Sequence, residues 1–113
     1  MARRTNVKLV LVTCGKLPEA RTIARSVVAK RLAACVNVLS APVFSVYRWQ
    51  GRVERGKEWL LIMKTTSSRL RALENEVIRL HSYSLPEFLV VGVHGGSEGY
   101  LRWVHESVDE KSK

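Results

Sequence analysis

Two side chains in the second half of the sequence could bind a metal ion together. His81 offers an imidazole nitrogen, and Glu87 offers a carboxylate oxygen a few residues later. A borderline nitrogen donor combined with a hard oxygen donor favours the later first-row divalent metals, Cu(II) and Zn(II) among them. Two ligands make only a weak site, which residues from a second copy of the chain would complete. Alternatively, His81 only ends a helix, where the carbonyl groups stabilise its partial positive charge.

The other histidines and both cysteines lack a partner at the spacing of a metal site. Cys14 and Cys35 form neither a zinc-binding pattern nor a C-x-x-C redox motif, and a cytoplasmic chain of this size keeps such thiols reduced. His94 precedes a glycine, and His105 lies in the terminal helical segment. We therefore interpret both histidines as surface residues and expect two buried free thiols.

The sequence contains no pattern typical of an enzyme active site. Covalent catalysis needs a nucleophile beside a base and an orienting group, and acid–base catalysis needs paired carboxylates in a cleft. The glycines between Gly92 and Gly99 do not match the phosphate-binding pattern G-x-x-x-x-G-K-[ST]. We therefore expect a non-enzymatic protein without an organic cofactor.

Length and composition indicate one soluble domain. The 113 residues and the hydrophobic content of 46% suit a single packed core, so we expect one domain over residues 1–113 with an ordered core over about 7–108. The longest apolar runs are far shorter than the roughly 20 residues of a membrane span. The N-terminal residues do not resemble an export signal. We therefore expect a cytoplasmic protein that does not enter a membrane.

The chain carries a formal net charge of +9. Such a charge is compatible with binding nucleic acid, with binding an anionic ligand, or simply with a well-solvated surface. The basic residues are scattered along the chain and form no stripe with interleaved aromatic residues. This distribution argues against nucleic acid as a partner.

Hydrophobic patterns predict the first two elements. Residues 7–14 are nearly apolar, which predicts a central strand. Pro18 opens a helix with Glu19 in its first turn. We expect this helix to end near Leu32 or Ala33. Its core-facing side repeats at helical spacing, at Ala20, Ile23, Ala24, Val27 and Val28.

A long hairpin is expected next. The β pattern of residues 35–39 is interrupted by Pro42 and resumes over residues 43–50, as in a long, bent edge strand. Gly51 supplies the tight turn, and we interpret Gly56 as a bulge in the return strand.

Tyr47 and Trp49 lie on one face of this hairpin. A strand of this length would project beyond a small domain and expose aromatic surface, which monomers rarely do. The pattern favours burial against a second copy of the chain, although the two rings could also line a ligand cleft between subunits.

The rest of the sequence predicts a second helix, a strand and a closing helix. Thr65, Thr66 and Ser67 offer N-caps for a second helix that ends near His81, with an apolar seam of Leu70, Leu73, Val77 and Leu80. A loop over 82–86, a strand over 87–93 and a helix near 100–108 follow, and the polar tail from Asp109 is expected to fray.

The order β-α-β, β-α-β with a closing helix predicts an α+β ferredoxin-like sandwich, βαββαβ, with both main helices on one face of an antiparallel sheet. Its first and second strands run parallel on either side of the third. Cys14 and Cys35 would then lie too far apart for a disulfide, which requires Cα atoms within about 7 Å.

Four segments resemble the CutA divalent-cation tolerance family. Residues 31–38 read R-L-A-A-C-V-N-V, residues 45–51 S-V-Y-R-W-Q-G, residues 81–87 H-S-Y-S-L-P-E and residues 100–103 Y-L-R-W. Their order and spacing match the family from about residue 7 to 108. The resemblance implies a homotrimer, in which long hairpins pair between subunits, with a role in divalent-metal tolerance and copper binding.

The resemblance also implies metal ligands. Members proposed to bind copper use a loop histidine and the glutamate after proline, which match His81 and Glu87. They also use a first-strand cysteine, whose place Val12 takes, with Cys14 two residues later. Ser82 and Ser84 stand where the family carries proline and an acid or amide, so the loop here is less rigid and less acidic.

An alternative follows from the similarity of such trimers to PII signalling regulators, which bind small anionic effectors in clefts between subunits. Arg48, Arg52 and Lys64 would hold the anion. Tyr47, Trp49 and Tyr83 would line the interface or cleft.

Overall fold

The computed structural model describes residues 5–110 of the chain. Residues 1–4 and 111–113, which include the end of the predicted frayed tail, lie outside the described part. No helix in the described part is long and apolar enough to cross a membrane. The elements are, in chain order, β1 (Val7–Cys14), α1 (Leu17–Ala29), β2 (Cys35–Val38), β3 (Val43–Trp49), β4 (Arg52–Thr66), a 3-10 helix (Ser67–Arg69), α2 (Leu70–Leu80), β5 (Leu89–Gly92) and α3 (Glu98–Val108).

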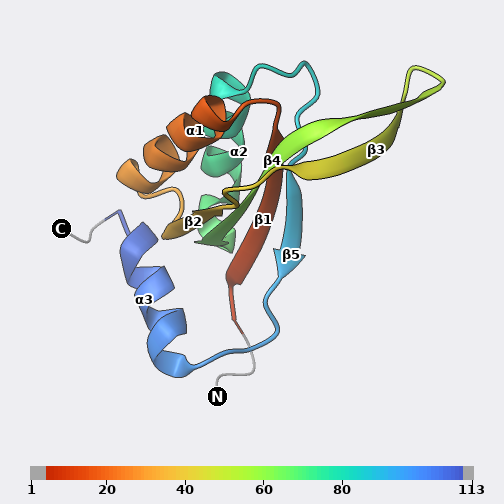
Figure 1. Ribbon diagram of the computed structural model, residues 1–113. Coiled ribbons are helices and arrows are strands. Elements are labelled where there is room, and N and C mark those ends of the chain that lie inside the picture. Colours follow the sequence, from red (N-terminus) through yellow and green to blue (C-terminus); the bar gives the residue numbers. More distant parts are fainter. Residues whose placement is uncertain (1–4, 111–113) are drawn as a thin grey trace.

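The strands form an antiparallel sheet in the order β2-β4-β1-β5, and β3 extends it by pairing with the first half of β4. β1 and β2 both pair with β4 and therefore run parallel to each other. Helices α1 and α2 lie side by side on one face of the sheet, and α3 packs near the end where β1 begins (Figure 1). The predicted ferredoxin-like arrangement is confirmed.

The core lies between the sheet and the two covering helices. Every second residue of β1 from Val10 to Cys14 is fully buried, as the pleat of a strand requires. These side chains pack with a buried set from β4, α1 and α2, namely Leu61, Met63, Ile23, Val27, Leu73 and Val77. Burying each such side chain stabilises the fold by about 1.5 to 3 kcal/mol. Val28, which was predicted to face the core, is instead 41% exposed.

Helix α1 ends earlier than the sequence predicted. Its last residue is Ala29, not Leu32 or Ala33. Arg31 has a φ of 58°, which stops the helical path. The N–H of Arg31 donates to the Val28 carbonyl and that of Leu32 to the Val27 carbonyl. These two bonds form a Schellman motif, which satisfies carbonyl groups that the helix end would leave free.

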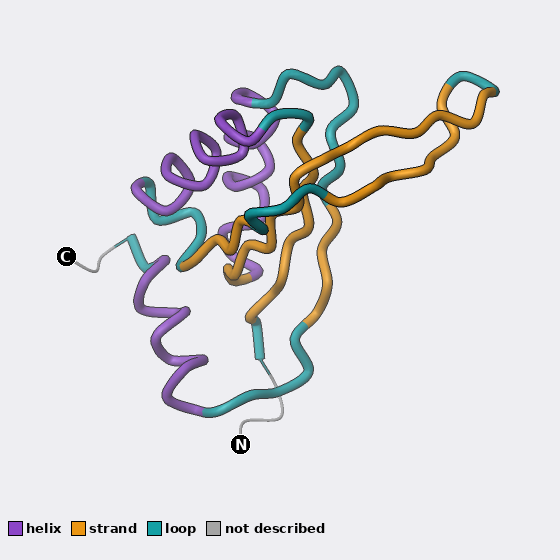
Figure 2. The backbone as a smooth tube through the Cα atoms, viewed as in Figure 1, coloured by secondary structure: helices purple, strands orange, loops and turns teal. Residues whose placement is uncertain are grey.

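The β3–β4 hairpin projects well beyond the sheet (Figure 2). Its register is regular from Val43 opposite Glu58 to Trp49 opposite Arg52. The prediction of a bulge at Gly56 is wrong, because Gly56 pairs directly with Ser45. The chain departs from the ladder between β2 and β3 instead.

The hairpin turn was predicted correctly. It consists of Gln50 and Gly51, which have φ values of 50° and 79°. Two successive positive φ values are typical of the two-residue turn whose twist matches that of a hairpin.

Two boundaries in the second half differ from the prediction. Thr65 and Thr66 do not cap α2, because β4 continues through both residues. The buried Thr65 hydroxyl donates instead to the Leu32 carbonyl at 2.7 Å and ties the loop after α1 to the sheet. β5 is also shorter than predicted, covering only Leu89–Gly92.

The two cysteines are free, as expected. Cys14 lies opposite Trp59 and Cys35 opposite Lys64 on β4. These positions are separated by roughly 17 Å at the usual rise of a strand, far beyond the reach of a disulfide. Cys14 is buried, whereas Cys35 is only half-buried.

Candidate metal centre

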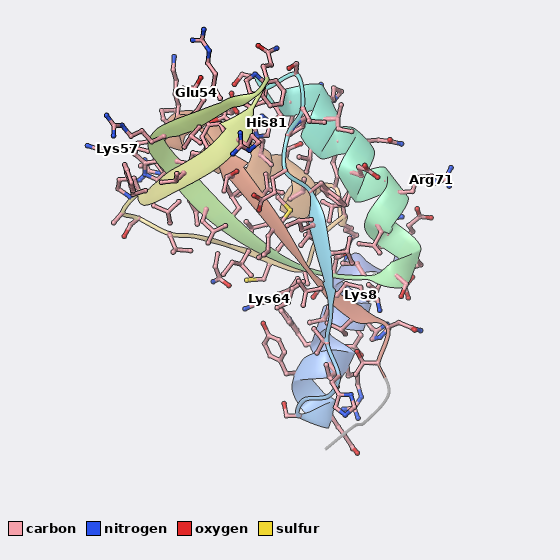
Figure 3. The ribbon with its side chains drawn as sticks, turned by 90° about the vertical axis from the view of Figure 1, so that its right-hand side faces the viewer. Lys8, Glu54, Lys57, Lys64, Arg71 and His81 are labelled. Atoms are coloured by element: carbon pink, nitrogen blue, oxygen red, sulfur yellow. The ribbon has the colours of Figure 1, made fainter. Side chains whose placement is uncertain are left out.

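His81 lies at the junction of α2 and the loop that follows it. It is the residue directly after the helix, and its N–H donates to the Val77 carbonyl at 2.9 Å. Its extended backbone, with φ −82° and ψ 140°, turns the chain away from the helix axis. The side chain has no exposed surface. In Figure 3 it lies near the point where the hairpin leaves the sheet.

Both nitrogen atoms of the His81 ring have close neighbours. Nδ1 accepts a hydrogen bond from the Tyr83 N–H at 3.1 Å, which assigns the ring proton to Nε2. Nε2 donates to the Thr13 carbonyl at 2.8 Å and lies 3.7 Å from Cys14 Sγ. On the other side of the ring, Nδ1 lies 3.5 Å from Glu19 Oε2. The imidazole is thus placed between a thiol and a carboxylate.

Cys14, Glu19 and His81 form one cluster. One ligand atom from each residue lies within 4.8 Å of the other two. Cys14 is the last residue of β1, and Glu19 lies in the first turn of α1, where the helix dipole stabilises a negative charge. The short link between the two elements brings the carboxylate back over the end of the strand.

The electrostatics of the cluster keep the thiol protonated. Burial, together with the negative charges of Glu19 and Glu58, raises the pKa of Cys14 to about 12. A cysteine nucleophile needs the opposite conditions, an exposed sulfur with a lowered pKa. The cluster is therefore poorly suited to nucleophilic catalysis. A thiol, an imidazole and a carboxylate are, however, all ligands of Zn(II) and related divalent metals.

Glu19 has a buried carboxylate oxygen that lacks a hydrogen-bond donor in the described part of the chain. Its Oε2 atom is buried and accepts no hydrogen bond from the described residues. A buried oxygen without a donor costs about 1 to 3 kcal/mol. A metal ion placed between the three side chains would remove that cost.

The structure does not bring Glu87 into this cluster. Val12 is buried in the core, and the cysteine that contacts His81 is Cys14. Glu19 was not identified from the sequence. The sequence did indicate the orientation of Cys14, because Cys14 continues the alternation of Val10 and Val12 and must therefore face the helices as they do. No comparable pattern points to Glu19.

Glu87 lies in a separate pocket of about 680 Å³ between the hairpin and the loop after α2. Tyr47, Trp49 and Glu58 line its hairpin side, and Tyr83 joins Glu87 on the loop side. The Tyr83 hydroxyl donates to Glu58 Oε2 at 2.9 Å. Burial raises the pKa of Glu87, and the nearby Glu58 carboxylate raises it further.

Only part of the predicted intersubunit cleft comes together in one subunit. Tyr47, Trp49 and Tyr83 share the pocket, whereas Arg48, Arg52 and Lys64 do not line it. Arg48 follows Tyr47 on β3 and therefore points to the opposite face of the hairpin. The Lys64 ammonium lies 5.7 Å from the centre of the Tyr100 ring, toward the other end of the sheet from His81 (Figure 3).

Comparisons with known proteins agree with this architecture. The family model described as "CutA1 divalent ion tolerance protein" matches residues 8–107. Protein CutA of Mus musculus is 40% identical over 107 residues, covering 95% of this chain but only 60% of the mouse protein. The divalent-cation tolerance protein CutA of Thermus thermophilus is 41% identical over 100 residues, covering 88% of this chain and 96% of the relative.

Solved structures show the same fold. The crystal structure of CutA from Xylella fastidiosa superposes with a TM-score of 0.88 at 40% identity, covering 93% of this chain and all of that one. Other relatives are named as chloroplastic or periplasmic proteins, so the expected cytoplasmic location stays a prediction. Family model, relatives and structures lead to one conclusion: the chain belongs to the CutA1 divalent ion tolerance family.

Proposed function

We propose that this protein binds a divalent metal ion, Cu(II) or Zn(II), at Cys14, Glu19 and His81. The observation that carries the proposal is the convergence of the three ligand atoms within 4.8 Å. The family description, divalent ion tolerance, is consistent with a cation as the ligand. The proposal replaces Glu87 of the predicted pair with Glu19, because Glu87 lies in the neighbouring pocket.

Binding would require two local changes. The Cys14 thiol must lose its proton, because the thiolate is the metal ligand. The imidazole must also give up hydrogen bonds: metal binding at Nδ1 would displace the bond from Tyr83 N–H, whereas binding at Nε2 would displace the bond to the Thr13 carbonyl and, because the proton then moves to Nδ1, the bond from Tyr83 N–H as well. If Nε2 binds the metal beside Cys14, Nδ1 becomes protonated and can donate to Glu19. Such a carboxylate partner orients a metal-bound histidine.

We also propose that the chain assembles with copies of itself, as a trimer, through the hairpin and β5. Phe44, Val46 and Val53 are each more than 60% exposed on one face of the hairpin. Leu89, Val90 and Val91 of β5 are exposed as well. β5 pairs with β1 on one side, and its other edge is unpaired in the described part of the chain. Exposed apolar surface next to a free strand edge is typical of an intersubunit contact.

The alternative of an anionic effector gains no support from the pocket. Arg48, Arg52 and Lys64 would have to hold the anion, and none of them lines it. The charged side chains among its described lining are carboxylates. We therefore place metal binding ahead of anion-dependent signalling.

Metal titration of matched variants tests the proposed site. We would add Zn(II), and Co(II) as a spectroscopic substitute, to the wild type and to Cys14→Ser, Glu19→Gln and Glu87→Gln. Native mass spectrometry counts bound ions and subunits, and the thiolate-to-cobalt absorption band reports a bond to Cys14. We expect one ion per subunit, at least a tenfold loss of affinity in Glu19→Gln, and little change in Glu87→Gln.

Glu87→Gln is the matched control because it removes the same charge nearby. If Glu87→Gln loses the metal while Glu19→Gln retains it, the pair predicted from the sequence is correct and the proposed cluster is wrong. If the wild type binds no ion or shows no cobalt–thiolate band, Cys14 is not a ligand.

A further inference from the structure

The pocket beside the cluster of Cys14, Glu19 and His81 is lined by different residues. Its volume of about 680 Å³ lies within the usual range of sites for small organic molecules. Tyr83 separates the two regions. Its N–H contacts the His81 ring, while its hydroxyl group contacts Glu58 on the pocket side. Cys14, Glu19 and His81 are not part of the lining.

The charge inside the pocket is opposite to that of the whole chain. The protein carries a net charge of +9, yet the charged side chains that line the pocket are Glu58 and Glu87. Both are half-buried, which weakens the screening of their mutual repulsion. The Tyr83 hydroxyl donates to one oxygen of Glu58, whereas the Glu87 carboxylate accepts no hydrogen bond from the described residues. A positively charged ligand would relieve this repulsion.

Aromatic and aliphatic side chains make up much of the remaining wall, beside small polar residues. Tyr47 and Trp49 point from the same face of β3, and Tyr83 faces them from the loop. The three side chains remain 38 to 47% exposed, so the core does not account for them. The face of an aromatic ring attracts a cation by about 0.5 to 2 kcal/mol, depending on how well water is excluded. Carboxylates and ring faces therefore favour the same kind of ligand.

We propose that this pocket binds a small organic cation of the alkylammonium class. The carboxylates of Glu58 and Glu87 would neutralise its charge, and the rings of Tyr47, Trp49 and Tyr83 would enclose its alkyl groups. A bare metal ion fits less well, because the cavity is far larger than a metal coordination sphere and much of its wall is apolar. An anion would meet two negative charges and no basic side chain among the described lining residues.

This inference goes beyond the metal site and does not depend on it. Phe44 and Val46 line the pocket and also belong to the exposed face through which we propose that the chain assembles, so the pocket would lie at a subunit boundary. A partner subunit could then cover the ligand, so the test must record the oligomeric state together with binding. Native mass spectrometry reports both in one measurement.

The first test compares two ligands of nearly equal shape that differ in charge. Calorimetry with the wild-type protein measures choline, its neutral isostere 3,3-dimethylbutanol, and the dicarboxylate glutarate. We expect choline to bind at least tenfold more tightly than the neutral isostere, and glutarate not to bind. Equal affinity for choline and the isostere, no choline binding at all, or tighter binding of glutarate would overturn the proposal. This comparison needs no variant and no change in folding.

The second test removes one charge at a time. Glu58→Gln and Glu87→Gln keep the size of the side chain, and each should weaken choline binding at least tenfold. Glu54→Gln is the matched control, because Glu54 is an exposed carboxylate on the same hairpin (labelled in Figure 3) and is outside the lining of the pocket. It should change the affinity less than twofold. An equal loss in all three variants would indicate only a diffuse negative surface and would contradict the proposal.

The two proposals can fail separately. Glu19→Gln should lose metal and keep choline, whereas Glu58→Gln should lose choline without changing the subunit number. A variant that loses choline only because the assembly dissociates would show that the pocket residues act as interface residues, which would also count against a ligand site.

Discussion

At the scale of single residues, Tyr83 connects the two candidate sites. Its ring centre lies 4.7 Å from that of His81, and its N–H holds the His81 ring in one tautomer. Its hydroxyl group contacts Glu58 and lies close to Gly15, where an added Cβ would stand only 3.0 Å from that oxygen. Gly15 thus leaves room for Tyr83. One residue thus fixes the His81 ring through its backbone N–H and forms a wall of the neighbouring pocket through its side chain.

Glu76 provides a prediction about stability and pH. Its side chain is 8% exposed; it accepts bonds from Ser26 and Lys30, which link the end of α1 to α2, and from Arg79 on α2 itself. The hydrogen bonds from Arg79, Ser26 and Lys30 hold the pKa of this carboxyl well below its usual range. Glu76→Gln should lower the free energy of unfolding at pH 7 by roughly 1 to 2 kcal/mol, a modest figure because Lys30 and Arg79 are solvent-exposed.

The sign of the pH effect follows from the lowered pKa. The stabilisation by Glu76 is complete above the pKa of the unfolded chain, near 4.5, and is lost as the pH falls toward the folded-state value. The difference in unfolding free energy between the wild type and Glu76→Gln, measured by urea unfolding, should therefore narrow steadily as the pH falls from 5 to 3. Glu74→Gln, an exposed change on the same helix, should show no such convergence. A pH-independent difference would refute the assigned role of Glu76.

At the scale of elements, the end of α1 depends on an unfavourable backbone angle. Arg31 adopts a φ of 58° in the Schellman motif, a position that glycine usually fills. Its side chain donates to the Ser107 carbonyl at 3.2 Å and so connects the helix end to α3. This tertiary contact offsets the cost of the backbone conformation.

Glycine and alanine substitutions should have opposite orders of stability at two positions of this segment. Both substitutions at Arg31 remove the contact with Ser107, so their difference reports the backbone alone. Arg31→Gly should be more stable than Arg31→Ala by about 1 kcal/mol. At Arg25, an exposed position inside α1, Arg25→Ala should instead be more stable than Arg25→Gly by about 1 kcal/mol. Thermal unfolding of the four variants decides the matter, and the same order at both sites would contradict the assigned cap.

At the scale of the whole molecule, the long hairpin sets the shape. The described chain extends over 44 Å along its longest axis but only 27 Å and 24 Å along the others. One face of the hairpin carries exposed Phe44, Val46 and Val53. A projection of this kind has no core of its own to stabilise it. Contact with other copies would supply the missing burial and cover the strand edges.

The proposed assembly predicts a selective effect of charge on the hairpin. Val46→Asp should convert the oligomer into smaller species, because a carboxylate would be buried in the contact. Ile78→Asp is the control, since Ile78 is a 52% exposed apolar residue on α2, away from the hairpin. Sedimentation equilibrium over a range of concentrations measures the mass. A monomeric wild type, or equal dissociation in both variants, would contradict the proposal.

Local patterns were sufficient for most of the fold. The alternation of Val10, Val12 and Cys14, the helical repeat of Ile23 and Val27, and the glycine turn after β3 each depend on residues close in sequence. Such patterns reflect the geometry of a strand, a helix or a turn, which neighbouring residues determine. The order of these elements then left few topologies, and the ferredoxin-like one was correct.

Tertiary packing decided what local patterns could not. Thr65 was predicted as a helix cap but lies in β4, where it pairs with Lys8 of β1 and its hydroxyl donates to the Leu32 carbonyl. Arg31 ends α1 although arginine favours helices, because its side chain reaches α3. Glu19 joins Cys14 and His81 because the sheet brings the end of β1 and the end of α2 together, 67 residues apart in sequence. The amino-acid sequence by itself determined the elements and the family. Only the folded chain brought the three candidate ligands together, because a partner across the core depends on packing and not on spacing in the sequence.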